Sequence, residues 1–128
     1  MPEITAEMKQ LLDETAIWVL ATSDRDALPN AVPIFFTLVL ENGKLLLVDN
    51  FMNKTIDNIQ QNPIVSVSVW KDKEGYQFKG IAELETIGTN FELGKELAKD
   101  RKPKGVVTVE ILSVYSTAPG PNAGKKLL

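Results

Sequence analysis

Runs of β-forming residues follow one another too closely in this chain for helices to connect most of them. Parallel neighbours need crossovers of about a dozen residues or more, whereas antiparallel neighbours need only a tight turn. The spacing therefore predicts a mainly β fold, a six-stranded antiparallel barrel, because closure removes the unpaired backbone groups of an open edge. The six expected strands cover residues 16–23, 30–40, 44–50, 64–71, 76–86 and 105–116.

Two local signals shape the expected strands. The sequence "ENGK" at 41–44 predicts a hairpin, in which Asn42 and Gly43 take the positive φ values of a type I′ turn. Gly80 interrupts a strand and indicates a bulge or the close approach of another backbone. With 128 residues, the chain is expected to form one domain, whose tail at 117–128 has no regular structure because Pro and Gly recur in it.

Three short helices are expected beside these strands. Thr5 is a candidate N-cap for a helix at 5–15, and Asn53 is one for a helix that stops before Pro63. Thr89 and Glu92 have the spacing of a capping box, which predicts a helix at 89–100.

The composition excludes several kinds of chemistry. The chain has no Cys and no His, so it lacks thiolate nucleophiles, sulfur ligands for zinc and the usual general base. A cofactor with its own reactivity is the natural route to enzyme activity in such a chain. The net charge of −3 argues against a nucleic-acid surface, and the basic cluster at 99–104 is expected to be a solvated connection. No apolar run reaches the roughly 20 residues that span a bilayer, so a cytoplasmic protein without membrane contact is expected.

Lys54 stands where a cation is unfavourable. It falls in the first turn of the expected helix after Asn53, where the helix dipole and unpaired N–H groups place partial positive charge. A bound phosphate would reverse that cost, since the helix N-terminus, the Lys54 ammonium and the Thr55 hydroxyl together supply donors and charge. The alternative is a solvated lysine whose stem bends away.

Two strands have an unusual surface. Residues 30–40 are apolar on both faces over much of their length, which indicates a covered outer face. A second copy of the chain is the simplest cover, and a helix of the same chain is the alternative. In residues 64–71, small Ser residues alternate with Val and end at Trp70, a face that suits either a cleft or solvent.

Several segments together resemble the flavin-binding split-barrel family, which includes pyridoxamine 5′-phosphate oxidase and small bacterial FMN-binding proteins. The resemblance is close over residues 16–86, and it rests on the order and spacing of the segments. These are "ATSDRDALPNAVPIFF", a hairpin, "LLLVDNFMNKTIDNIQQNP", "IVSVSV" and "GYQFKGIAEL".

The resemblance implies a homodimer of six-stranded split barrels with FMN at the interface. It implies flavin-ring contacts along the strand at 30–35, contacts to the ring edge or ribityl chain at 49–51, and phosphate binding at 53–55. Trp70 and Tyr76 are candidate walls from the partner chain, with ordinary interface packing as the alternative. The tail after Tyr115 either folds over the partner's flavin or is a free terminus. The candidate cofactor-binding residues are Asn30, Val32, Pro33, Ile34, Phe35, Asp49, Asn50, Phe51, Asn53, Lys54, Thr55, Trp70, Tyr76 and Asn122.

The same resemblance implies a flavin-dependent oxidoreductase or electron-transfer protein, with a small-molecule or protein redox partner. The flavin N5 would carry the chemistry, so no catalytic side chain and no metal ligand are assigned. Pyridoxamine-phosphate oxidation is not expected, because the Arg- and His-containing C-terminal segment of the true oxidases has no counterpart here. The alternatives are a deazaflavin F420-binding reductase of the same fold, a non-enzymatic module for a phosphorylated ligand or heme, and a barrel without ligand.

Overall fold

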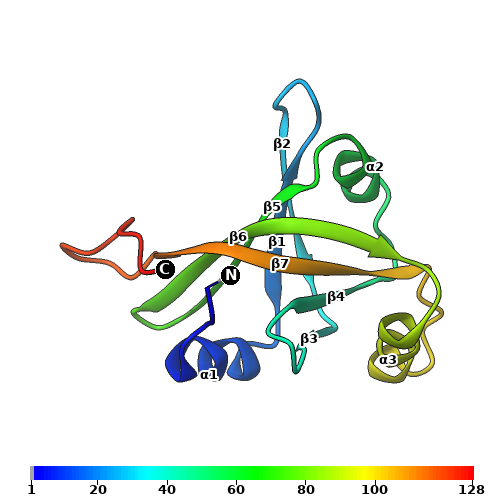
Figure 1. Ribbon diagram of the computed structural model, residues 1–128, viewed down its shortest axis with the longest axis horizontal. Helices are drawn as coiled ribbons and strands as arrows, with labels where there is room; N and C mark the ends of the chain where they lie inside the picture. The colour runs from blue at the N-terminus through cyan, green and yellow to red at the C-terminus, as the bar shows by residue number, and fades with distance from the viewer. Residues whose placement is uncertain (1) are drawn as a thin grey trace.

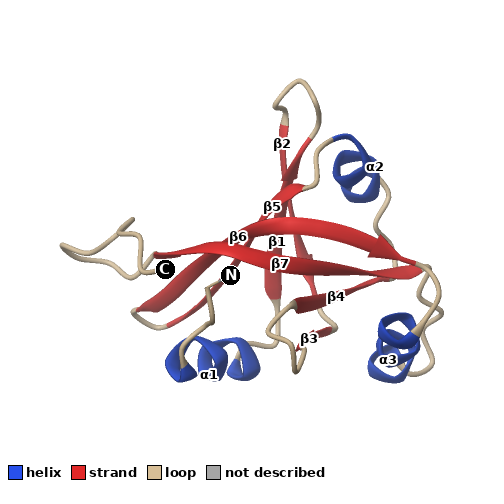
Figure 2. Ribbon diagram, in the orientation of Figure 1, coloured by secondary structure: helices blue, strands red, loops and turns tan. Residues whose placement is uncertain are grey.

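The computed structural model describes residues 2–128 as one curled antiparallel sheet with three short helices at its margins (Figures 1 and 2). This confirms the mainly β prediction. Strands are hydrogen-bonded in the order β2-β1-β5-β6-β7-β4-β3. The elements are α1 (Ala6–Glu14), β1 (Trp18–Ser23), β2 (Pro29–Ile34), β3 (Thr37–Val39), β4 (Leu45–Asp49), α2 (Lys54–Gln61), β5 (Ile64–Lys71), β6 (Glu74–Glu85), α3 (Thr89–Ala98) and β7 (Gly105–Ser116).

The sheet of residues 2–128 has seven strands where six were predicted, because the run at 30–40 breaks at Phe35 and Phe36. Its first half, β2, pairs with β1, and its second half, β3, pairs with β4. These halves are the two outermost strands of the sheet. The Phe35–Phe36 corner therefore carries the chain from one end of the curled sheet to the other, and the Val48 amide donates to the Phe36 carbonyl at 3.0 Å.

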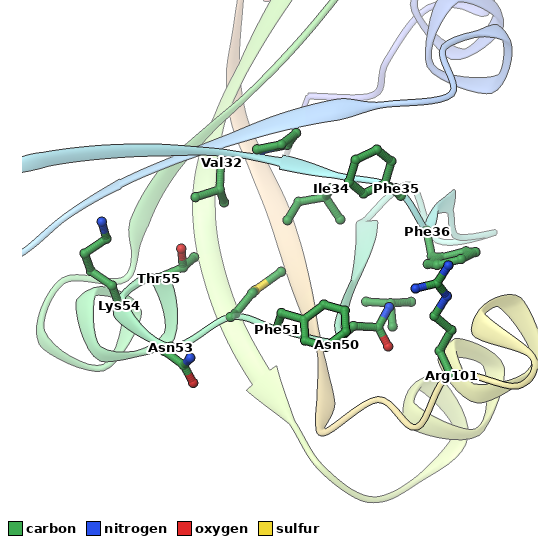
Figure 3. A pocket seen from close by; sticks show the side chains of 13 residues that line it. Val32, Ile34, Phe35, Phe36, Asn50, Phe51, Asn53, Lys54, Thr55 and Arg101 are labelled. Carbon is green, nitrogen blue, oxygen red and sulfur yellow. The ribbon is translucent and has the colours of Figure 1, made fainter.

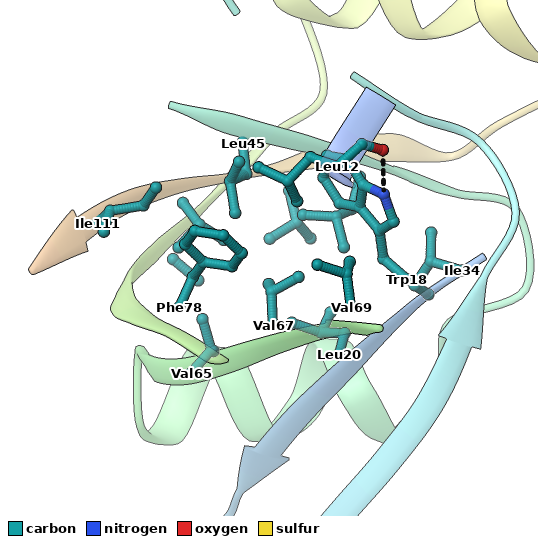
Figure 4. Packing of buried hydrophobic residues seen from close by; sticks show 14 of the residues in the cluster. Leu12, Trp18, Leu20, Ile34, Leu45, Val65, Val67, Val69, Phe78 and Ile111 are labelled. Atoms are coloured by element: carbon teal, nitrogen blue, oxygen red, sulfur yellow. Dashed lines mark hydrogen bonds between the residues drawn. The ribbon is translucent and has the colours of Figure 1, made fainter. Parts of the chain in front are cut away.

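The core lies on the concave side of the sheet (Figure 4). Alternate residues of the strands point into it, among them Leu20, Val67 and Phe78, all fully buried. Each such burial contributes about 1.5–3 kcal/mol. Helix α1 covers one opening, where the Trp18 indole nitrogen donates to the Leu12 carbonyl at 3.1 Å. The polar atom of a buried tryptophan is thereby satisfied.

A second, smaller cluster packs α3 against the outside of the sheet. It contains Leu46, Val48, Ala98 and Val106. Gly94 allows this contact, because a Cβ there would collide with a methyl group of Val106. The loop after α3 is thus brought beside β4.

The turn at 41–44 differs from the prediction. Only Gly43 has a positive φ, of 87°, so the turn is not type I′. The Gly43 amide donates to Leu40, and Leu40 donates to Lys44, which gives a three-residue hairpin loop with glycine in the left-handed position. The predicted irregularity at Gly80 is confirmed, since the β6–β7 register shifts there and a side chain would meet the Glu110 carbonyl.

The predicted helix caps have mixed outcomes. Thr5 caps α1, and its Oγ1 accepts from the Met8 amide at 3.2 Å. Asn53 precedes α2 as predicted but makes no side-chain cap bond. The capping box is wrong: Gly88, with a φ of 99°, precedes α3, so Thr89 already lies within the helix, one residue too late to cap it.

The tail at 117–128 is irregular over most of its length but does not hang free. Lys126 forms an isolated β-bridge with Tyr115, and Val114 exchanges backbone hydrogen bonds with Leu127 and Leu128. Leu128 packs on the core. No helix within residues 2–128 is long and apolar enough to cross a membrane.

Candidate functional site

A cleft of about 700 Å³ lies between β2, the turn that joins β4 to α2, and the loop that follows α3 (Figure 3). Its size is typical of small-molecule sites, which span about 300–1,000 Å³. It is lined by Val32, Pro33, Ile34, Phe35, Phe36, Val48, Asn50, Phe51, Met52, Asn53, Lys54, Thr55 and Arg101.

The wall of the cleft that β2 forms is an unpaired edge of the sheet. Strand β2 pairs only with β1, so the other edge of residues 32–35 makes no ladder hydrogen bonds within residues 2–128. Backbone N–H and C=O groups on such an edge are available to a ligand. Pro33 has no N–H, so the donors on this stretch come from its neighbours.

The N-terminus of α2 forms one end of the cleft. Lys54 is exposed there and Thr55 is buried, and both side chains lie on the cleft side of the helix in Figure 3. The first amides of a helix have no intrahelical acceptor, and the dipole adds partial positive charge. Lys54 makes no salt bridge within residues 2–128. This end of the cleft is therefore cationic and rich in donors.

A polar network fixes the position of that helix end. Asn30 on β2 donates to Thr55 Oγ1 at 3.0 Å and to Thr22 Oγ1 at 3.2 Å, and Asn58 donates to Thr22 Oγ1 at 3.0 Å. Because Thr55 Oγ1 accepts in this network, its own hydroxyl hydrogen stays available to a ligand. Asn30 thus positions Thr55 and is not itself a lining residue.

The turn from β4 into α2 is held by a buried carboxylate and a lysine. Asp49 Oδ1 accepts from the Met52 amide at 2.8 Å, and Lys104 Nζ donates to the Met52 carbonyl at 2.6 Å and to Asn53 Oδ1 at 3.1 Å. This bond to Lys104 explains why Asn53 does not cap α2. Burial raises the pKa of Asp49, while the Met52 amide and the Lys104 ammonium oppose that rise.

Asn50 leaves one polar atom unsatisfied in the cleft wall. Its Oδ1 is buried and has no hydrogen-bond partner among residues 2–128. Buried polar atoms are nearly always paired, because an unpaired one costs about 1–3 kcal/mol. Asn50 Oδ1 therefore has an unmet hydrogen bond beside the cleft.

The opposite end of the cleft is aromatic and carries a second cation. Phe35 is 62% exposed and Phe51 is 80% exposed, large fractions for phenylalanine. The Arg101 guanidinium lies 5.9 Å from the centre of the Phe36 ring, within the range of a cation–π contact. In Figure 3 it points into this end, far from Lys54.

The structure brings most of the predicted site residues together, and their binding roles stay predictions. Nine line the cleft: Val32, Pro33, Ile34, Phe35, Asn50, Phe51, Asn53, Lys54 and Thr55. Asn30 and Asp49 lie immediately behind it through the bonds above. The other three lie on other elements: Trp70 is exposed on β5, Tyr76 packs on Phe78, and Asn122 is in the exposed tail.

Sequence reasoning missed four lining residues, which are Phe36, Val48, Met52 and Arg101. The first three adjoin predicted residues, so they could have been found. Arg101 had no local signal, because its basic cluster was expected to be solvated. Packing of α3 on β4 and β7 brings that loop to the cleft. No group of three or more potential metal-ligating side chains occurs within residues 2–128.

Comparison with known proteins identifies relatives over nearly the whole chain. The family model described as pyridoxamine 5′-phosphate oxidase matches residues 4–118. The uncharacterized protein MJ0282 of Methanocaldococcus jannaschii is 38% identical over 130 residues, which cover 96% of this chain and 87% of that protein.

Solved structures agree with this family match. HupZ of Group A Streptococcus superposes with a TM-score of 0.82 at 29% identity, over 94% of this chain and 99% of HupZ. An FMN-binding protein of Syntrophomonas wolfei gives a TM-score of 0.77 at 15% identity, over 88% and 84% of the two chains. The heme storage protein HutZ of Vibrio cholerae gives 0.66 at 14% identity, over 90% and 95%. The last two likenesses show the shared fold alone.

Proposed function

This chain belongs to the pyridoxamine 5′-phosphate oxidase family, and on that premise we propose that it binds FMN in the cleft and acts in flavin-dependent electron or hydride transfer. The observation that carries the proposal is the position of the α2 N-terminus, with Lys54 and Thr55, at one end of a largely apolar slot. FMN has the matching form, a phosphate at one end and a planar ring at the other.

The phosphate is assigned to the Lys54 end. Free amides at the start of α2, the Lys54 ammonium and the Thr55 hydroxyl would all donate to phosphate oxygens. Asn30 holds the Thr55 oxygen at 3.0 Å, which orients the hydroxyl before any ligand arrives. Such preorganisation strengthens binding because less freedom is lost when the ligand arrives.

The flavin ring is assigned to the slot between β2 and the Asn50–Phe51 stretch. Its walls are Val32, Ile34 and Met52, and the free edge of β2 offers backbone groups to the polar rim of a flavin. Asn50 Oδ1, which has no partner among residues 2–128, fits a ring N–H or a ribityl hydroxyl as its donor. The residues present therefore suit FMN.

Bound FMN supplies hydride or single-electron transfer, and the chain supplies position, polarity and exclusion of water. Lys54 and Thr55 would anchor the phosphate, and β2 would orient the ring. No side chain is assigned as general acid or base. The redox partner would be a small molecule or a protein that reaches the open end of the cleft.

A homodimer forms part of the proposal. Ile64 on β5 lies opposite Ile81 on β6, and these two side chains are 51% and 41% exposed. Leu112, at the bulged part of β7, is 46% exposed. These exposed apolar side chains share the outer face with Lys79 and Glu110, and they are the proposed contacts with a second copy.

The visible spectrum of the purified protein, followed by release of the chromophore, tests the cofactor assignment. The proposal predicts the two bands of an oxidised flavin and release of FMN. A deazaflavin band would instead indicate F420, and a Soret band would indicate heme, as stored by HutZ. The chain has no His or Cys, which provide many heme axial ligands. Either of these results, or a protein that fails to bind added FMN, would overturn the assignment.

A further inference from the structure

We infer that Lys104 is a positioning residue, which holds the side chain of Asn53 out of the capping position of α2 and so keeps the first amides of that helix available to an anion. This inference deepens the proposed function and rests on it, because the anion is the phosphate assigned to this end of the cleft. Helix α2 is preceded by a residue type that usually caps, yet it has no side-chain cap.

Two helix starts of the chain differ in this respect. Thr5 precedes α1 with extended backbone angles, φ −75° and ψ 164°, and its Oγ1 accepts from the Met8 amide at 3.2 Å. Asn53 precedes α2 with φ −123° and ψ −72°, and its side chain makes no cap bond. Asparagine is among the most favourable N-cap residues, so the cause of the missing cap lies outside the helix.

Lys104 is the group that holds Asn53. Its Nζ donates to Asn53 Oδ1 at 3.1 Å and to the Met52 carbonyl at 2.6 Å. Oδ1 is the atom that would accept from a helix amide in a cap, so the first bond occupies the capping group itself. The second bond fixes the peptide group that precedes Asn53. In Figure 3 the Asn53 side chain points away from Thr55.

Lys104 is in turn held by Asp49. The Lys104 amide donates to the Asp49 carbonyl at 2.8 Å, and Nζ lies 3.8 Å from Asp49 Oδ1. A cation beside a helix N-terminus is unfavourable on its own, and this carboxylate offsets the charge. The arrangement that keeps Asn53 away from α2 is therefore built before any ligand arrives.

The consequence concerns the donors at the start of α2. The first intrahelical bond runs from the Asp57 amide to the Asn53 carbonyl at 3.1 Å, so the amides of Lys54, Thr55 and Ile56 have no acceptor in the helix. An asparagine cap would take the Thr55 or Ile56 amide, and a phosphate needs the same donors. Cap and phosphate therefore compete, and a typical cap would weaken phosphate binding about fivefold.

The position of Asn53 can be measured without FMN. Its ¹³Cα and ¹³Cβ chemical shifts depend on ψ, so they distinguish the present conformation from the extended one of a cap. Lys104 is half-exposed, and Lys104→Met is expected to fold and to move both shifts to extended values. Lys102→Met removes a charge from the same exposed loop and should leave them unchanged. If Lys104→Met does not fold, Lys104→Gln takes its place. Unchanged Asn53 shifts in the folded variant would overturn the inference.

Titration with FMN shows whether the cap competes with the phosphate. Lys104→Met is expected to weaken FMN binding about fivefold, whereas the same change in an Asn53→Ala protein should have no such effect, because no cap can form there. Equal weakening with and without Asn53→Ala would mean that Lys104 acts through its charge or the turn alone, and would overturn the inference. A wild type that binds no FMN would contradict the proposed function, while the Asn53 shifts would still decide whether Lys104 prevents the cap.

Discussion

The side-chain amide of Asn30 donates to Thr55 Oγ1 at 3.0 Å, which joins strand β2 to the first turn of α2. These residues are 25 positions apart in the sequence, and they connect the strand wall of the cleft to its cationic end. Because of this bond, the folded chain orients the Thr55 hydroxyl without the help of a ligand.

Asn30→Ala should therefore weaken FMN binding without touching the flavin. We expect a loss of about 0.5–1.5 kcal/mol in FMN binding, and a similar decrease in the free energy of unfolding. Quenching of FMN fluorescence and urea unfolding measure the two quantities. Asn90→Ala is the control, because it removes bonds to Glu85 away from the cleft and should lower stability alone. If Asn30→Ala bound FMN like the wild type, the positioning role would be wrong.

Lys54→Ala should weaken FMN binding but should not lower the stability of the FMN-free protein. Without FMN, removing a cation from a helix N-terminus should leave stability unchanged or raise it by about 0.3–1 kcal/mol. Binding of FMN should weaken by about 1.5–3 kcal/mol through loss of a charge-assisted hydrogen bond. Thermal unfolding with and without saturating FMN shows both effects, with Lys73→Ala in the β5–β6 turn as control. Unchanged FMN affinity would place the phosphate elsewhere.

Asp49 should make stability depend on pH. Its folded-state pKa is raised from the ordinary 3.8 by burial, so the folded protein binds a proton more readily than the unfolded chain. Its stabilising contribution is complete at low pH and is lost as pH rises through the folded-state pKa. Wild type should thus gain stability relative to Asp49→Asn as pH falls from about 7 toward about 4. Urea unfolding of both proteins across this range provides the measurement, and a difference independent of pH would contradict the assignment.

Ile81 tests the proposed dimer face. Ile81→Lys places a charge opposite Ile64 on the outer surface, where it is 41% exposed in the monomer, and should shift the protein toward monomer. Ile87→Lys is the matched control, since Ile87 is 82% exposed in the β6–α3 connection. Light scattering after size-exclusion chromatography gives the mass. A monomeric wild type, or an Ile81→Lys protein that stays dimeric, would refute this face.

Local patterns determined much of the fold in advance. Strand alternation in residues 64–69 and the N-cap at Thr5 are decided by near neighbours, and both predictions are confirmed. The break at Phe35 and Phe36 was missed, because the run is largely apolar and the corner arises only when its two halves pair with β1 and β4 at opposite ends of the sheet. The capping box failed for a local reason, since Gly88 and not Thr89 precedes the first residue of α3.

The candidate site likewise contains some residues that local sequence predicts and others that only long-range packing brings to the cleft. Lys54 and Thr55 were recognisable because a cation in a first helical turn is locally unfavourable. Arg101 and Lys104 were not, because their proximity to the cleft depends on α3 packing against β4 and β7, a contact between distant segments. The unpaired Oδ1 of Asn50 likewise exists only in the folded chain.

Parallel titration of the wild type with FMN and riboflavin shows whether the Lys54 end of the cleft binds the FMN phosphate. The two ligands share the ring and ribityl chain, so their difference in affinity isolates the phosphate. FMN is expected to bind at least about a hundredfold more tightly than riboflavin, since several charge-assisted hydrogen bonds would form at the Lys54 end. Equal affinity for both ligands, or no binding of either, would contradict this expectation.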